Sequence, residues 1–199
     1  MNHWVILKKC LTIYTNFPGS TVFYPSDAVS CERSAELAAN TKGICFIRTS
    51  RPATAVIYQN DHVFEIGKGN MVLSHDRDDV LVVGAGVTLH EALKAHPTLA
   101  AEGINIAVMD PFTIKPIDKE MLVREAARCG GRVLTVEDHY PEGGLGEAVV
   151  TALAEQRNVI VKRLAVREVP RSGPPNVLLD HFGISAKAIA EAVKQMASM

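Results

Sequence analysis

The chain has 199 residues, of which 47% are hydrophobic and 22% are charged, a balance that is ordinary for a globular protein with a substantial core. The formal net charge of −1 excludes a general electrostatic attraction to nucleic acid, so we expect no nucleic-acid partner. No apolar stretch approaches the ~20 residues of a membrane span, and the apolar run at 4–7 lacks the features of a signal peptide. We therefore predict a cytoplasmic protein without a membrane partner.

The first ordered elements are expected after residues 1–19, which show no clear periodicity. The run Thr21–Tyr24 predicts a short strand, and Asp27 is expected to cap a helix that ends near residue 40. The continuous apolar run Ile44–Ile47 is typical of a strand that is buried on both faces. These elements together predict a β-α-β unit.

A connection is expected over residues 52–79. It contains two extended pieces, at 55–58 and 71–73, and the glycines of 67–70 predict a hairpin turn before the second piece. We place a domain boundary between residues 60 and 75.

Strands alternate with helices from residue 80 onward, which predicts a mostly parallel sheet covered by helices on both faces. Thr88 is expected to cap the first helix, and Pro97 is expected to kink or divide it. Asp118 and Ser185 are expected to cap two later helices. The expected strands cover 80–83, 104–109, 132–136 and 159–166. The predicted fold class is therefore α/β, a doubly wound, mostly parallel domain preceded by a partial β-α-β piece of a second α/β domain.

Residues Gly84–Leu89 stand between a strand and a helix, where dinucleotide-binding folds place their phosphate loop. The third glycine of that motif is missing, because position 89 is leucine, and the only acid at the end of the next strand, Asp110, precedes a proline. We favour a tight strand-to-helix turn and keep a free-standing nucleotide-binding protein as the alternative.

Residues Glu137–Tyr140 follow a predicted strand and are themselves followed by the glycines of 143–146. Two acids and an imidazole at the carboxyl end of a strand are suited to acid–base chemistry or to a metal. The favoured interpretation is a loop that packs against another domain, with Glu137 or His139 paired locally.

Residues Arg48–Pro52 follow the buried strand of the first unit, at the edge where open α/β sheets bind ligands. Arg51 offers a planar, permanently charged set of donors that suits a phosphate, and Ser50 adds a hydroxyl. The alternative for Arg51 is an ion pair at the surface, and the residues alone leave the choice open.

Seven blocks of the chain resemble animal transketolases in the same order, over residues 20 to 199. They are STVFYPSD at 20–27, AANTKGICFIRTSRP at 38–52, GAGVTLHEAL at 84–93, DPFTIKP at 110–116, TVEDHY at 135–140, GGLGEA at 143–148 and VPRSG at 169–173. The two-subunit thiamine dehydrogenases share the expected carboxy-terminal fold, but the blocks at 110–116 and 169–173 resemble transketolase instead.

The resemblance implies a homodimeric enzyme that transfers a two-carbon ketol unit between sugar phosphates in the pentose phosphate pathway. In that family an amino-terminal domain binds thiamine diphosphate through Mg²⁺ or Ca²⁺, and a middle domain binds the cofactor's pyrimidine. The implied division of this chain is a divergent segment at 1–19, a partial pyrimidine-binding domain at 20–60, a linker at 61–74 and the carboxy-terminal domain at 75–199. Arg51 aligns with the arginine that grips the substrate phosphate, and Ser50 is a further candidate contact.

The sequence departs from the family pattern in ways that bear on catalysis. It has no counterpart of the metal and diphosphate motif, of the glutamate that activates the pyrimidine, or of the residues that orient the sugar. We therefore expect no catalytic, cofactor-binding or metal-binding residues in this chain, and we expect it to be inactive alone. Its partners are expected to be sugar phosphates and transketolase subunits. The alternative is a non-catalytic assembly or regulatory domain that docks on full-length subunits.

Overall fold

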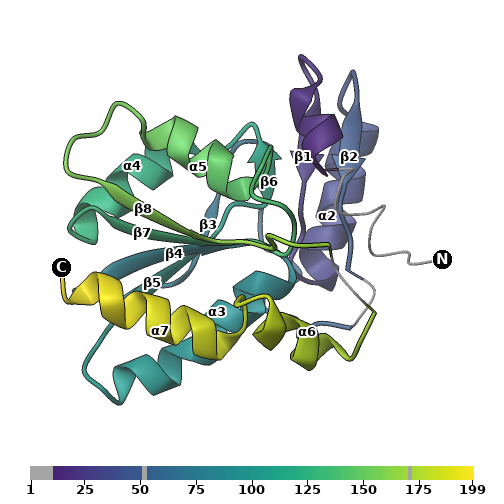
Figure 1. Ribbon diagram of the computed structural model, residues 1–199. Helices are drawn as coiled ribbons and strands as arrows, with labels where there is room; N and C mark the ends of the chain where they lie inside the picture. Colours follow the sequence, from purple (N-terminus) through teal and green to yellow (C-terminus); the bar gives the residue numbers. More distant parts are fainter. Residues whose placement is uncertain (1–10, 51–52, 170–171) are drawn as a thin grey trace.

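The protein is described by a computed structural model over residues 11–50, 53–169 and 172–199. Its strands form two sheets (Figure 1). The strands are β1 (Thr21–Phe23), β2 (Cys45–Ile47), β3 (Asn70–Leu73), β4 (Val80–Gly84), β5 (Ile106–Asp110), β6 (Thr113–Lys115), β7 (Arg132–Val136) and β8 (Ile160–Leu164). The main sheet has the order β3-β5-β4-β7-β8, and β3 is antiparallel to its neighbour while the other pairs are parallel. The α/β fold class with a mostly parallel main sheet is thus confirmed.

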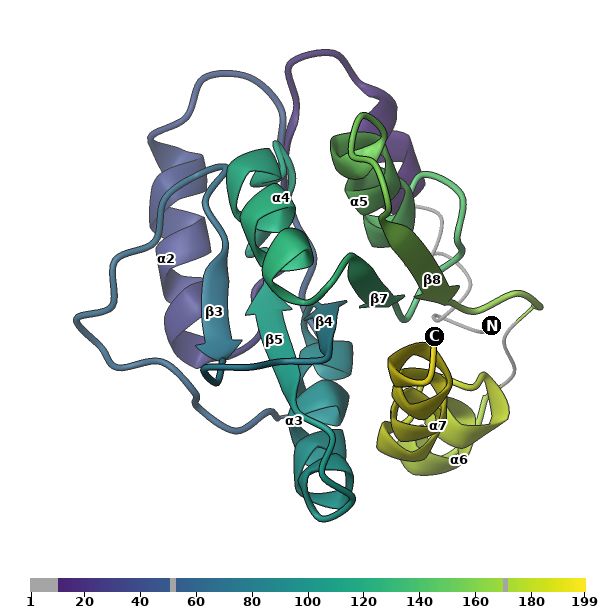
Figure 2. The same ribbon diagram turned by 90° about the vertical axis from the view of Figure 1, so that its left-hand side faces the viewer.

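Helices cover both faces of the main sheet. They are α2 (Ala28–Ala39), α3 (Val87–Ala100), α4 (Lys119–Arg128), α5 (Leu145–Leu153), α6 (Pro175–His181) and α7 (Ala186–Ala197), and residues 11–16 are also helical. Figures 1 and 2 show α4 and α5 on one face of the sheet and α3 and α7 on the other, which is the doubly wound arrangement. Helix α2 stands beside the small sheet of β1 and β2.

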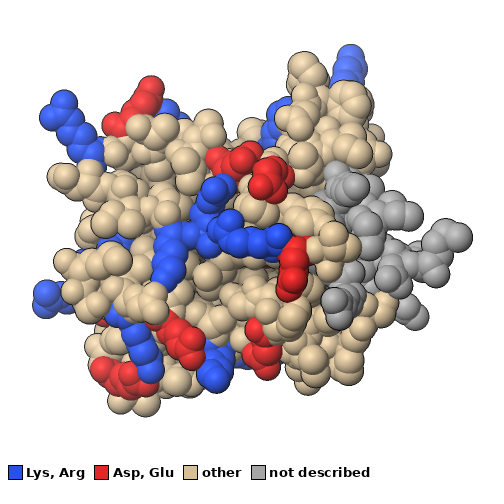
Figure 3. All heavy atoms as spheres, in the orientation of Figure 1, with Lys and Arg blue, Asp and Glu red and all other residues tan. Residues whose placement is uncertain are grey.

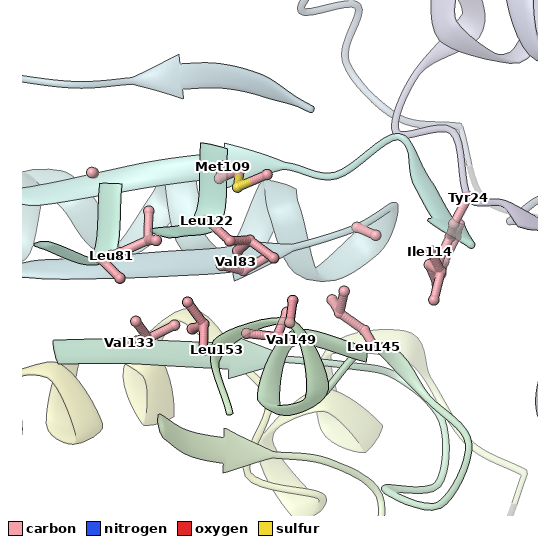
Figure 4. Close-up of a cluster of buried hydrophobic side chains, with 14 of the residues drawn as sticks. Tyr24, Leu81, Val83, Met109, Ile114, Leu122, Val133, Leu145, Val149 and Leu153 are labelled. Atoms are coloured by element: carbon pink, nitrogen blue, oxygen red, sulfur yellow. The ribbon is translucent and has the colours of Figure 1, made fainter. Parts of the chain in front are cut away.

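The central strands β4 and β5 are buried along their whole length. Helices on both faces exclude water from both sets of alternating side chains, which explains why these strands are continuously apolar in sequence. Leu81 and Val83 of β4 pack with Leu122 of α4 and Val149 of α5 in one buried cluster (Figure 4). Tyr24, which follows β1, joins this cluster at the end nearest the small sheet.

Three of the four predicted helix caps are confirmed. Asp27 accepts a hydrogen bond from the backbone N–H of Ser30 at 2.8 Å, Asp118 accepts one from Met121 at 2.9 Å, and the Ser185 side chain caps α7. These side chains satisfy N–H groups that have no partner within the helix.

The fourth cap is wrong, because α3 begins at Val87 with Gly86 as its N-cap. Thr88 instead lies inside the first turn, where its buried hydroxyl donates to the carbonyl of Val136 at 2.7 Å and ties α3 to β7. Pro97 does not divide the helix, which continues to Ala100. The missing N–H removes only the one helical hydrogen bond to the carbonyl of residue 93.

The first unit and the connection differ from expectation in their strands. β2 is half-buried rather than buried, because it is the outer strand of the order β2-β1-β6. The predicted hairpin at 67–70 is wrong, since β3 pairs antiparallel with β5 and not with the residues that precede it. The extended piece at 55–58 is not a strand, and β6, which pairs antiparallel with β1, was not predicted.

Candidate functional site

Two of the sequence motifs meet at the point where the main sheet reverses its strand order. The chain leaves β4 for β5 on one side of it and later places β7 on its other side. In doubly wound sheets, a ligand usually binds in the crevice beyond the carboxyl ends of the two strands between which the order reverses, here β4 and β7. The turn at 84–86 follows β4 there, and the loop that begins with Glu137 follows β7.

Tyr24 fills the space beside the glycine turn. Its side chain is only 2% exposed, and a Cβ atom on Gly86 would lie 2.3 Å from the Tyr24 Cε2 atom. The next segment of the chain also docks on the turn, because the Gly86 N–H donates to the Ser26 hydroxyl at 2.9 Å. The glycine therefore permits close packing of this chain on itself. This supports the interpretation of 84–89 as a tight strand-to-helix turn and not as a phosphate-binding loop.

A buried ion pair joins the end of β2 to the loop after β7. The Arg48 Nη2 atom lies 2.9 Å from the Asp138 Oδ2 atom, and Arg48 is only 7% exposed. Its guanidinium carbon also lies 4.5 Å from the centre of the Tyr24 ring, within range for a cation–π contact. Burial lowers the pKa of Arg48, but its interactions with Asp138, Tyr24 and Glu137 together outweigh burial, so the pKa is raised and the side chain stays charged.

The Tyr24 hydroxyl completes this arrangement. It donates to the Asp138 Oδ1 atom at 2.9 Å. Burial raises the pKa of Tyr24 well above its usual value, so the phenol remains a hydrogen-bond donor at neutral pH. Arg48, Asp138 and Tyr24 thus form one buried network.

A cavity of about 340 Å³ lies beside Ser50, at the carboxyl ends of β1 and β2. Its lining includes the hydroxyl-bearing residues Ser26, Thr49, Ser50 and Thr54, and hydroxyls are suitable donors to an anionic oxygen. Arg51 lies outside the described residues, between two residues, Ser50 and Ala53, that line the cavity.

The one acid in this cavity, Asp27, already has three partners. Its carboxylate accepts the N–H groups of Ser30, Ile57 and Tyr58 at 2.8 to 3.0 Å. Although burial raises the pKa of Asp27, these hydrogen bonds outweigh it, and the pKa is lowered. Asp27 therefore acts as a structural hub that fixes the start of α2 and the connection beside it.

Glu137 and His139 are both buried, each 1% exposed, and the Glu137 Oε2 atom lies 3.3 Å from His139 Nε2. The same oxygen accepts the Gly146 N–H at 3.1 Å, which satisfies the start of α5, where Gly144 provides no side-chain cap. A Cβ atom on Gly144 would lie 2.2 Å from His139 Cε1. Burial raises the pKa of Glu137 to about 8. These contacts support the predicted local pairing in a packed loop.

Asp110 is also explained by packing. It is fully buried at the end of β5, where it accepts the Tyr58 hydroxyl at 2.7 Å and the Phe112 N–H at 3.0 Å. Burial raises its pKa to about 6. The hydrogen bonds hold the connection and the turn before β6, where Phe112 has a positive φ of 55°.

Within residues 11–50, 53–169 and 172–199, no three His, Cys, Asp or Glu side chains come together so that they could hold a metal ion. The helices in this described part of the chain are all too short or too polar to cross a membrane.

Comparison with known proteins gives one consistent family. The family model described as "Transketolase, C-terminal domain" matches residues 67–189. Human and mouse transketolases are each 56% identical over 184 residues, which is 92% of this chain and 30% of the relative. A solved structure described as a split-gene transketolase, inactive β4 tetramer, has a TM-score of 0.87 and 33% identity, covering 96% of this chain and 61% of the other. The chain therefore spans about 30% of the length of these curated relatives.

Proposed function

The chain belongs to the transketolase family, and from that premise we propose that it supplies the carboxy-terminal part of an enzyme that transfers a two-carbon ketol unit between sugar phosphates. The observation that carries the proposal is the 56% identity to human transketolase over 184 residues. We further propose the division into a partial pyrimidine-binding domain at 20–60, a linker at 61–74 and a carboxy-terminal domain at 75–199. The cytoplasmic location stays a prediction.

In this proposal, Arg51 and Ser50 contact the phosphate of the sugar substrate. The support is the cavity beside Ser50, whose lining includes Ser50 and Ala53, the residues on either side of 51–52 in sequence. A guanidinium binds phosphate oxygens through parallel charge-assisted hydrogen bonds. Neighbouring hydroxyl groups would help to orient the phosphate without adding further charge.

The reaction itself depends on residues other than those described. Thiamine diphosphate supplies the carbanion chemistry in this family, while the protein binds, orients and polarises the reactants. The described residues offer no donor set for its Mg²⁺ or Ca²⁺, so they do not fit the cofactor's metal. We propose that a polypeptide of these 199 residues alone does not catalyse ketol transfer.

This proposal is tested by an assay of the purified chain with thiamine diphosphate, Mg²⁺, a ketose phosphate donor and an aldose phosphate acceptor. Human transketolase in the same buffer is the positive control. The expected rate with the chain alone equals the rate without protein. Ketol transfer by the chain alone would contradict the proposal.

A second candidate function is a non-catalytic subunit that docks on full-length transketolase. The observation that favours it is a difference between two outer strands, because β8 has a charged edge and β2 has an uncharged one. β8 carries Lys162 and Arg163, and Figure 3 shows basic side chains gathered over this strand, which protects an edge against pairing. β2, with the sequence CFI, carries no charge, and Ile44 beside it is 45% exposed.

The test of this second candidate is co-purification of the tagged chain with untagged full-length human transketolase. A stable complex with altered ketol-transfer rate would support docking. A monomeric chain in light scattering that retains no transketolase would eliminate this candidate.

A further inference from the structure

We propose that the hollow at the carboxyl end of β8 is a binding site for a small phosphate monoester, held by the guanidinium groups of Arg163 and Arg167. This β8 hollow is lined by residues 163–165, 167, 168 and 181–183, and its volume of about 340 Å³ is within the range of small-molecule pockets. It shares no lining residue with the cavity beside Ser50, so this site is independent of the role proposed for Arg51.

Basic side chains gather over β8 (Figure 3), and the charge of Arg163 among them is uncompensated. In the described part of the chain, no carboxylate forms an ion pair with Arg163 or Arg167. The charge of Arg163 does act on the buried Glu137, but burial has the larger effect and raises the pKa of Glu137 to about 8. Glu137 is therefore mainly protonated at neutral pH, and it leaves the guanidinium available to an anion from solution.

The stem of Arg163 is held in place by the start of α5. A Cβ atom on Gly146 would lie 2.6 Å from the Arg163 Cδ atom, so the arginine stem packs directly on this glycine. The backbone of Arg163 is fixed as well, because it pairs in register with Thr135 of β7. A packed stem leaves the guanidinium fewer conformations, and a donor that is ordered in advance loses less entropy when it binds.

The backbone between the two arginines is also anchored. Ala165 and Val166 are buried, and the Val166 N–H donates to the carbonyl of His139 at 3.0 Å. Arg163 and Arg167 therefore lie on either side of a fixed pair of residues. Arg167 is exposed, so a ligand can reach it from solvent. Two planar guanidinium groups at one hollow suit the several oxygens of a phosphate, which accept charge-assisted hydrogen bonds in parallel pairs.

The rest of the lining offers little that repels an anion. Its one acid, Glu168, is paired with His181, with 2.7 Å between Oε1 and Nε2. At the end of α6, the carbonyls of residues 178–180 accept the N–H groups of residues 182–184 at 3.0 to 3.1 Å, so these oxygens are not unpaired acceptors. Leu164 and Phe182 add apolar surface that suits the carbon chain of an ester.

The test is a titration of the isotope-labelled 199-residue chain, followed through its backbone amide chemical shifts. Inorganic phosphate and glycerol 3-phosphate are the probes, and glycerol at the same ionic strength is the uncharged comparison. Arg163→Gln and Arg167→Gln each remove one guanidinium and keep a polar side chain. Arg157→Gln removes an exposed arginine in the loop before β8, at the other end of the strand, and is the matched control for net charge.

Both phosphate probes are expected to shift the amide signals of residues 163–168 and 181–183, and glycerol is expected to shift none of them. Arg163→Gln and Arg167→Gln should each weaken the affinity for glycerol 3-phosphate about tenfold, through the loss of one charge-assisted contact. Arg157→Gln should leave the affinity unchanged. The spectra of the variants without ligand show directly that each remains folded.

Shifts confined to residues 49–54 would place the phosphate in the cavity beside Ser50 and would overturn the inference. Equal losses of affinity in Arg157→Gln and Arg163→Gln would also overturn it, because they would show a general attraction to basic surface. Saturable shifts around the β8 hollow in a chain that shows none at 49–54 would support this site and count against the proposed phosphate role of the Ser50 cavity. The two proposals therefore fail separately.

Discussion

The ring of Tyr24 occupies the place that a side chain on residue 86 would need, since a Cβ atom on Gly86 would lie 2.3 to 2.7 Å from three atoms of the phenol. The end of β1 and the turn after β4 are thereby interlocked. The crevice where a doubly wound sheet binds a ligand is filled by an aromatic residue of the same chain. This interlock accounts for the glycine without any bound nucleotide.

Gly86→Ala is expected to destabilise the protein more than Gly103→Ala. Both glycines have positive φ, 57° and 76°, but no atom lies within 4 Å of a Cβ at 103. The control therefore reports the cost of a positive φ alone, about 1 kcal/mol. Gly86→Ala should lose roughly 1–3 kcal/mol more, through overpacking against Tyr24 and through its ψ of −125°, which side chains other than glycine disfavour. Urea-induced unfolding measures the free energy of unfolding of both variants. Equal losses would show that the Tyr24 ring moves aside without an energetic cost.

Glu137→Gln is expected to flatten the pH dependence of stability. The folded-state pKa of Glu137 is raised to about 8, above the ~4.3 of an unfolded chain, so the native state holds this proton more tightly. Its contribution is fully present below about pH 4 and is lost as pH rises toward 8, by up to about 1.4 kcal/mol per pH unit. Glutamine stays neutral and can still accept the Gly146 N–H.

This difference is measured by urea unfolding between pH 4.5 and 8, with the exposed Glu142→Gln as control. His139 lies 3.3 Å from Glu137, and Asp138, Arg48 and Arg163 also act on this buried region, so the curve reports the coupled group. Parallel curves for wild type and Glu137→Gln would contradict a raised pKa in the folded state.

Ile44→Lys is expected to reduce any association through the edge of β2 by several-fold, because a charged side chain opposes strand pairing. Ile44 is 45% exposed, so the loss of folding stability should be small. Val150→Lys, at a 41% exposed position on α5 away from any strand edge, is the control. Sedimentation velocity across a concentration series compares the association of the two variants. An equal effect of both lysines would argue against association through the edge of β2.

Local sequence signals predicted much of the fold. Asp27, Asp118 and Ser185 cap helices as expected, because a capping side chain acts on N–H groups only two or three residues away. The small sheet was predicted less well. β6 has three residues and pairs with a strand about 90 residues earlier, a register that tertiary packing selects and that no local periodicity encodes.

In the candidate site, too, local features were predicted and long-range contacts were not. The segments 48–52, 84–89 and 137–140 were identified from their place after predicted strands. Their partners were not, because Arg48 and Tyr24 lie 90 and 114 residues from Asp138. The sequence carries no spacing signal for such contacts, and Tyr24 reads as an ordinary aromatic at the end of a strand.

We propose that this chain is a working carboxy-terminal part of a transketolase. Its most direct test is ketol transfer by a hybrid in which the 184 aligned residues replace the matching segment of human transketolase. The hybrid is expected to transfer ketol units, and Arg51→Gln in the hybrid is expected to raise KM for the aldose phosphate by at least about tenfold, the loss of one charge-assisted contact. A folded hybrid that binds thiamine diphosphate but transfers no ketol unit would contradict the proposal that the chain is a working part of a transketolase.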